Sequence, residues 1–221
     1  MARSWTAPGV VGATIHAVCI GDDIMVLDLR TDAYLCLPGA GAWLQNDGSS
    51  PDHSRRLTDV LAKAGLAVDP QSSPRAPPPH ASADLEDAIA GPLQWRDLLD
   101  AGWATLDVWL NYRRRTLSQL LTLAIAGSRT EASDAATCAR ALELARAFRR
   151  WSILCPVPGK CLVRSFMLLR FLQRRGASAI WVFGVRTWPF RAHCWLQVGP
   201  VVIDDAYERL IAYSPILAVT A

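Results

Sequence analysis

Lysine is almost absent from this chain: Lys63 and Lys160 are the only two in 221 residues, and arginine supplies the other positive charges. The formal net charge is only +3. The runs Arg113–Arg115, Arg149–Arg150 and Arg174–Arg175 flank predicted helices and form no basic tail. We interpret them as solvated helix faces, with a groove for an acidic peptide or nucleic acid as the weaker alternative. We expect no nucleic acid partner.

A long hydrophobic run is also missing. The longest apolar stretch, Leu117–Ala126, is interrupted by polar residues and falls well short of the roughly 20 residues that span a bilayer. Met1–Pro8 contains one arginine and no apolar core, unlike a signal peptide. We therefore expect a cytoplasmic protein without a membrane partner.

The cysteines do not form the pattern of a secreted disulfide framework. There are six in the chain, and in a reducing compartment most should be free thiols. Cys19 and Cys36 lie in strand-like apolar runs, and Cys138 lies in a predicted helix. We expect these three to be small core residues.

The N-terminal part predicts three short strands followed by helices. Alternating apolar residues and turn residues predict strands at Ile15–Ile20, Ile24–Leu29 and Ala33–Leu37. A helix is predicted from Ala40 to Gln45. A second helix ends at Gly65, a C-cap, and has one apolar face made by Leu57, Val60, Leu61 and Ala64. This order predicts a small winged-helix-like domain over residues 1–68.

Residues 69–83 are rich in proline and serine, so we predict an extended linker there. A second domain follows over residues 84–221. Its predicted helices are Asp84–Ile89, Pro92–Tyr112, Leu117–Ala126, Ala132–Trp151 and Leu162–Arg175. Its predicted strands are Ala179–Arg186, His193–Val198 and Val201–Asp204. The fold class is therefore α+β, with helices first and a small antiparallel sheet last.

Cys161 lies at the start of the predicted helix Leu162–Arg175. The segment Pro156–Lys160 is a rigid turn, because each proline disfavours helix in the residue before it. A thiol at a helix start lies near the positive end of the helix dipole, which lowers its pKa. Free N–H groups at the same end can stabilise an oxyanion. These features make Cys161 a candidate nucleophile.

A thiol nucleophile needs a base, and His193 is the only histidine in the second domain. The others are His16, His53 and His80. Gly199–Pro200 turns the chain after the strand of His193, so the returning strand should bring Asp204 or Asp205 close to the ring. The order Cys, His, Asp predicts a cysteine peptidase or an acyl-transfer enzyme.

Structural roles for these residues are the alternative. Cys161 can be a buried cysteine at a helix start, His193 a half-buried strand residue, and Asp204 or Asp205 a turn cap. A zinc site is a further alternative, with ligands from Cys155, Cys161, His193 and Cys194. There is no C-x2-C pair, and the adjacent residues His193 and Cys194 should point to opposite faces of a strand. We therefore expect no metal and no cofactor.

With these motifs, the second half of the chain resembles the lasso-peptide leader peptidases in their fused form. The resemblance rests on Lys160–Ser165 at the nucleophile, Ala192–Val198 at the histidine and Val202–Asp205 at the acid. It implies a papain-like, transglutaminase-like core with Cys161, His193 and Asp205 as the catalytic triad. Asp205 matches the acid of the family better than Asp204. Cys194 departs from the family, which usually has a small residue such as alanine there.

The first domain resembles the RiPP recognition element, on the segments Gly21–Asp28 and Asp32–Leu37. In such domains a leader peptide adds as a strand at the edge of the three-stranded sheet and packs against the last helix. The resemblance implies a platform for the leader made by Tyr34, Leu35, Cys36, Leu57, Val60 and Leu61.

The function implied is a cysteine endopeptidase that binds the leader of a lasso-peptide precursor and cleaves it from the core before macrocyclisation. The implied partners are that precursor and an asparagine-synthetase-like lasso cyclase. Two alternatives stay open: a non-catalytic peptide chaperone or scaffold, and a transglutaminase-type acyl transferase. The three candidate triad residues favour an enzyme over the scaffold, but they do not separate hydrolysis from acyl transfer.

Overall fold

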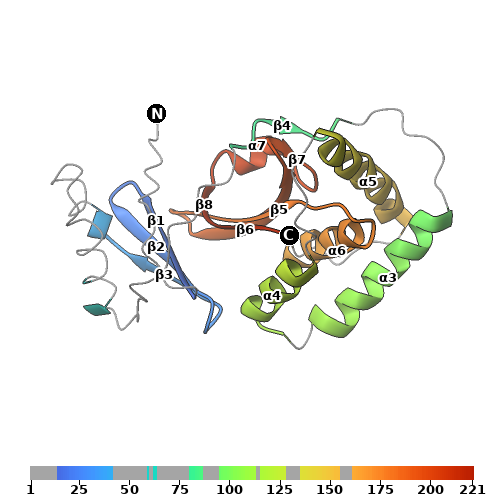
Figure 1. Cartoon of the computed structure of the whole chain (residues 1–221). Helices are drawn as coiled ribbons and strands as arrows, with labels where there is room; N and C mark the ends of the chain where they lie inside the picture. The colour runs from blue at the N-terminus through green and yellow to red at the C-terminus, as the bar shows by residue number, and fades with distance from the viewer. Residues whose placement is uncertain are drawn as a thin grey trace.

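The computed structural model describes residues 14–41, 59, 62–63, 80–86, 95–112, 115–127, 135–154 and 161–221. A three-stranded sheet lies at one end of the molecule, a five-stranded sheet lies in the middle, and the longer helices lie at the other end (Figure 1). The α+β class predicted from the sequence is confirmed. Within these described ranges, no helix is long and apolar enough to cross a membrane.

The N-terminal sheet is an antiparallel meander in the order β1-β2-β3. Its strands are β1 (Ile15–Ile20), β2 (Asp23–Asp28) and β3 (Ala33–Leu37), close to the predicted bounds. The two tight turns place Gly21 at φ 60° and Asp32 at φ 55°, in the left-handed region that glycine and aspartate tolerate. Of the predicted helix Ala40–Gln45, the structure describes only the first two residues, which are helical.

Four long helices follow and agree with the predicted segments to within a few residues. They are α3 (Trp95–Asn111), α4 (Leu117–Gly127), α5 (Ala135–Leu154) and α6 (Cys161–Arg174). The helix predicted at Asp84–Ile89 is wrong at its start, because Ala83–Asp84 forms the short strand β4. Ala83 pairs with Val201 and Asp84 pairs with Val202, so pairing with a distant strand overrides local helix propensity.

The second sheet has the order β4-β7-β6-β5-β8. Besides β4, its strands are β5 (Ile180–Arg186), β6 (Arg191–Val198), β7 (Val201–Val202) and β8 (Ser214–Thr220), with the short helix α7 (Tyr207–Leu210) before β8. The predicted antiparallel strands β5, β6 and β7 are present, but β4 runs parallel to β7 and makes the sheet mixed. Strand β8 was not predicted; it contains Pro215, a residue that argues against a strand.

Helix α6 is the centre of the hydrophobic core, and Phe166, Leu169 and Leu172 on it are fully buried. The same core cluster includes Trp181 of β5 and reaches Leu27 of β2, so one face of the N-terminal sheet packs into it. Cys36, expected to be a core residue, is instead exposed on the outer strand β3. The core therefore fixes α6, β6 and the first sheet in one arrangement.

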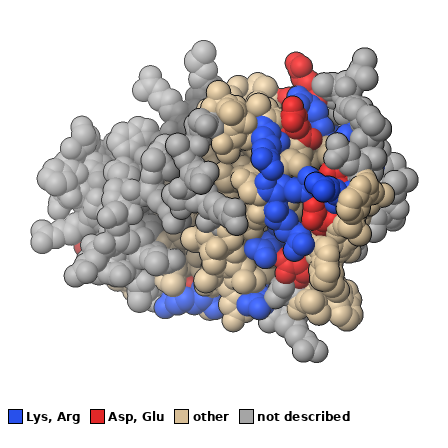
Figure 2. All heavy atoms as spheres, turned by 45° about the vertical axis from the view of Figure 1, so that its right-hand side comes forward, with Lys and Arg blue, Asp and Glu red and all other residues tan. Residues whose placement is uncertain are grey.

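Several arginines are used in pairing between elements. Directly after α6, Arg175 donates to Asp97 of α3 at 2.8 Å and also pairs with Asp100. Arg149 of α5 donates to the carbonyl oxygen of Leu85. Arginine side chains gather on the face seen in Figure 2, with acidic side chains among them. The interpretation of the arginine runs as solvated helix faces therefore does not hold for Arg149 and Arg175, which bind partners on other elements.

Candidate active site

Cys161 is the first residue of α6, as predicted, and is partly buried. Its position places the sulfur at the positive end of the helix dipole. The N–H groups of the first turn of a helix have no partner within the helix, so this end can also bind a developing negative charge.

His193 and Asp205 form a close pair beside Cys161. The ring Nε2 of His193 lies 2.6 Å from Oδ2 of Asp205, and both side chains are largely shielded from solvent. The His193 ring also hydrogen-bonds with the Cys161 side chain. Because Nε2 faces Asp205, Nδ1 is the ring nitrogen left for the sulfur. The structure thus brings together the three residues singled out in the sequence.

The hairpin of β6 and β7 explains how the aspartate reaches the histidine. Gly199 turns the chain at φ 55°, and Val198 pairs with Val201 directly after it. Asp204 then becomes buried, and its Oδ1 accepts the Leu196 N–H at 2.8 Å. Asp205, the next residue, contacts His193 instead. The two neighbouring aspartates therefore have different partners.

The electrostatics favour a thiolate and an imidazolium. Hydrogen bonds from the Cys194 and His193 side chains lower the pKa of Cys161 to about 4, against an opposing effect of burial. Hydrogen bonds with Asp205 and Cys161 raise the pKa of His193 to about 9. Burial would raise the pKa of Asp205, but hydrogen bonds from His193 and the Ala206 N–H hold it below its usual value. At neutral pH the site therefore holds an ion pair ready for nucleophilic attack.

Sequence reasoning missed the role of Cys194 as a neighbour of Cys161. Cys194 faces α6, where its Sγ lies 3.4 Å from the Ser165 hydroxyl. Ser165 also donates to the Cys161 carbonyl oxygen at 2.9 Å and accepts the Trp181 indole N–H at 3.0 Å. The only signal in the sequence was the adjacency of His193 and Cys194, which does not reveal a contact with the helix.

Two aromatic rings hold the His193 side chain. The Trp195 ring stacks near it with centroids 6.4 Å apart, and the Tyr213 ring lies at 5.4 Å. Gly184, which pairs with His193 across the strands, leaves room for Trp195: a Cβ at Gly184 would lie 2.7 Å from that indole ring. The absence of a side chain at position 184 thus helps to place the histidine.

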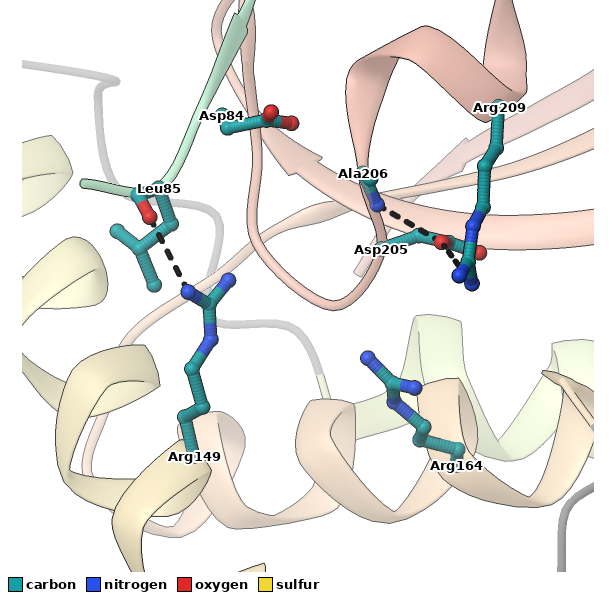
Figure 3. Close-up of a pocket in the computed structure, with 7 residues that line it drawn as sticks. All are labelled: Asp84, Leu85, Arg149, Arg164, Asp205, Ala206 and Arg209. Atoms are coloured by element: carbon teal, nitrogen blue, oxygen red, sulfur yellow. Dashed lines mark hydrogen bonds and ion pairs between the residues drawn. The ribbon is translucent and has the colours of Figure 1, made fainter. Parts of the chain in front are cut away.

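A pocket of about 360 Å³ is lined in part by Asp205 (Figure 3). Its lining residues are Asp84, Leu85, Arg149, Arg164, Asp205, Ala206 and Arg209. The Nη1 of Arg209 on α7 lies 3.6 Å from Oδ1 of Asp205, and the charge of Arg164 on α6 contributes to the lowered pKa of that carboxyl group. The charge of Arg164 thus adds to the hydrogen bonds from His193 and the Ala206 N–H, which are the larger causes of the lowered pKa of Asp205.

The residues expected to bind a leader peptide are only partly described. Leu35 and Cys36 are exposed on β3, one of the two edge strands of its sheet. Tyr34 is partly buried, and its ring packs against Phe190 at 5.7 Å. Burial is the main cause that raises the pKa of Tyr34 to about 12, and the negative charge of Cys161 contributes to it. The remaining three, Leu57, Val60 and Leu61, lie outside the described residues.

The described ranges contain no set of side chains that could bind a metal ion. Cys155 lies outside them, and no three His, Cys, Asp or Glu side chains within them are grouped as a metal ion requires. Cys161, His193 and Cys194 instead contact each other or Asp205. The arrangement is that of an acid–base and nucleophile site.

Comparison with known proteins agrees with this geometry. McjB of Escherichia coli, described as a microcin J25-processing protein, is 50% identical over 46 residues, which are 21% of this chain and 22% of McjB. The chain thus matches less than a quarter of that relative's length. No solved structure matches. Together with the family model below, this similarity confirms the resemblance to the lasso-peptide leader peptidases.

The family model described as the transglutaminase-like superfamily matches residues 104–218, just over half of the chain. This range includes Cys161, His193 and Asp205. The chain belongs to the transglutaminase-like superfamily.

Proposed function

We propose that the protein is a cysteine endopeptidase that cleaves the leader from the core of a lasso-peptide precursor. The observation that carries this proposal is the contact of His193 with both Cys161 and Asp205, where Cys161 begins a helix. The similarity to McjB supports a processing role for the chain. We place the reaction in the cytoplasm, before macrocyclisation.

Each residue has a defined step in the proposed reaction. The Cys161 thiolate attacks the carbonyl carbon of the scissile bond, and the N–H groups at the start of α6 stabilise the oxyanion. His193 then gives its proton to the leaving amine as the C–N bond breaks, and a thioester remains on Cys161. His193 takes a proton from water, which attacks the thioester and releases the leader acid. Asp205 orients the ring and stabilises its charged form.

Leader recognition is assigned to the N-terminal sheet. An edge strand with unpaired N–H and C=O groups can accept a peptide as an additional strand, and β3 is such an edge. Tyr34 on β3 is within electrostatic range of the Cys161 sulfur. A leader docked on β3 would therefore hold the following residues close to the nucleophile, which raises their effective concentration.

The partners follow from this assignment. The first is a short precursor peptide that carries the leader. The second is an asparagine-synthetase-like lasso cyclase, which needs the amine that cleavage exposes. We propose residues 1–68 as the recognition domain, 69–83 as the linker and 84–221 as the peptidase domain. One hydrophobic core includes residues of the N-terminal sheet and of the helices, so the two proposed domains would share a core.

The test is cleavage of a lasso-peptide precursor, followed by mass spectrometry of the products. Wild-type protein should release leader and core, whereas Cys161→Ala should give no core but bind a fluorescent leader with unchanged affinity. Cys138→Ala, which changes a cysteine on α5, is the matched control and should cleave like wild type. Cleavage by Cys161→Ala at the wild-type rate would refute the proposal. A product in which the leader is joined to an added amine, without hydrolysis, would identify an acyl transferase instead.

A further inference from the structure

A second thiol lies directly against the candidate nucleophile. Cys194 is buried on β6 and faces the first turn of α6, which begins with Cys161. Ser165, one turn along that helix, contacts the Cys194 Sγ at 3.4 Å and the Cys161 carbonyl oxygen at 2.9 Å. The side chains of Cys161 and Cys194 are themselves in hydrogen-bonding contact.

The two thiols differ in ways that suit different chemical roles. Cys161 is partly exposed and ionised, which are the properties of a thiol that reacts with oxidants. Cys194 is buried and protonated, because the hydrogen bond with Cys161 and burial both raise its pKa. Oxidants in solution therefore react with Cys161 first, while the neighbouring Cys194 stays reduced.

We propose that Cys161 and Cys194 form a reversible disulfide when a peroxide oxidises the nucleophile, so that Cys194 is a resolving cysteine. The bond itself requires only these two residues. Its consequence, a reversible block of leader cleavage, rests on the proposed function.

Both steps balance with hydrogen peroxide as the oxidant. The Cys161 thiolate attacks one peroxide oxygen, an S–O bond forms, the O–O bond breaks, and the leaving hydroxide takes a proton to become water. Cys161 is now a sulfenic acid, and the negative charge that helped keep Cys194 protonated is gone. The Cys194 sulfur then attacks the Cys161 sulfur, the S–S bond forms, and the hydroxyl leaves with the Cys194 proton as water.

The bond protects the nucleophile from further oxidation. A sulfenic acid without a nearby thiol proceeds to the sulfinic acid, which a dithiol does not reduce. A disulfide is reduced again by thiol exchange, which restores both thiols.

Full-length protein treated with hydrogen peroxide tests this inference. After alkylation under denaturing conditions and digestion without reductant, mass spectrometry should find the Cys161 and Cys194 peptides joined, and dithiothreitol should separate them. In Cys194→Ala, Cys161 should instead be found as sulfinic acid that dithiothreitol does not reverse. Cys138→Ala is the matched control and should form the same bond as wild type.

The second readout is the rate of precursor cleavage. For each variant, the rate after peroxide treatment is divided by the rate of the same variant before treatment. Dithiothreitol should restore most of the lost cleavage in wild type and in Cys138→Ala, but little in Cys194→Ala. A bond from Cys161 to any other cysteine, or sulfinic acid on Cys161 with Cys194 still alkylated in wild type, would overturn the inference. Formation of the bond in a protein that never cleaves the precursor would refute only the proposed function.

Discussion

The Nε2 of His193 lies 2.6 Å from Oδ2 of Asp205, whereas the preceding residue, Asp204, accepts the main-chain N–H of Leu196. Asp205 therefore orients the ring of the candidate base, His193. Its neighbour Asp204 instead stabilises the β6–β7 hairpin.

The two aspartates should differ in their effect on activity. Asp205→Asn removes the charge that stabilises the His193 imidazolium, so we expect kcat/KM for precursor cleavage to fall by roughly 10²-fold. Asp204→Asn keeps an oxygen for the Leu196 N–H and should stay within a few-fold of wild type. His193→Ala should be nearly as severe as loss of the cysteine. Steady-state cleavage assays measure all three, and the opposite order for the two aspartates would assign the acid to Asp204.

The rate of cleavage should have a broad, bell-shaped pH dependence. Activity requires Cys161 as thiolate and His193 protonated, so kcat/KM should rise as pH passes about 4 and fall as pH passes about 9. These limits belong to the coupled pair rather than to either residue alone. In Asp205→Asn the upper limit should move to lower pH, because the main cause of the raised pKa of His193 is gone. An unchanged upper limit in this variant would argue against the assignment.

Asp204 should make the stability of the fold depend on pH. Burial raises its pKa from 3.8 to about 7 in the folded protein. Between these values the unfolded chain releases the proton that the folded chain keeps, so the free energy of unfolding should fall as pH rises. The fall is at most about 1.4 kcal/mol per pH unit, and it ends above pH 7. Asp204→Asn should remove this component. Urea denaturation at several pH values measures it, with Asp22→Asn in an exposed turn as the control.

Gly184 should not tolerate a methyl group. In Gly184→Ala the new Cβ would lie 2.7 Å from the Trp195 ring, which must then move and disturb the packing on His193. We expect a loss of about 1–3 kcal/mol in stability, as for other overpacked cores, and a lower rate of cleavage. Gly102→Ala is the matched control, since nothing lies within 4 Å of its Cβ position on α3. Chemical denaturation should find Gly102→Ala unchanged or slightly stabilised.

Asp32 should couple the N-terminal sheet to the helices. Both of its carboxylate oxygens lie 3.1 Å from the N–H of Leu117, the first residue of α4, so a side chain from the first sheet caps this helix. Asp32→Ala should cost about 0.5–2 kcal/mol for the lost cap, with further strain because Asp32 has φ 55°. Asp32→Asn keeps an acceptor and tolerates this φ, so thermal unfolding should place it near wild type. Equal destabilisation by both variants would contradict the capping role.

Local patterns in the sequence were enough to predict the strands of the first sheet, the four long helices and the start of α6 at Cys161. They were enough because turn residues, capping positions and apolar periodicity act over a few residues. The β6–β7 hairpin was predictable for the same reason, and with it the return of an aspartate toward His193.

Only the tertiary structure decided which aspartate contacts His193, because a shift of one residue along the hairpin reverses the face of each side chain. It also decided that Cys194 touches Cys161, that β4 joins β7, and that Asp32 caps a helix 85 residues later. These contacts join segments far apart in the chain. They depend on how α6 and the sheets pack around a common core, which no local pattern of residues specifies.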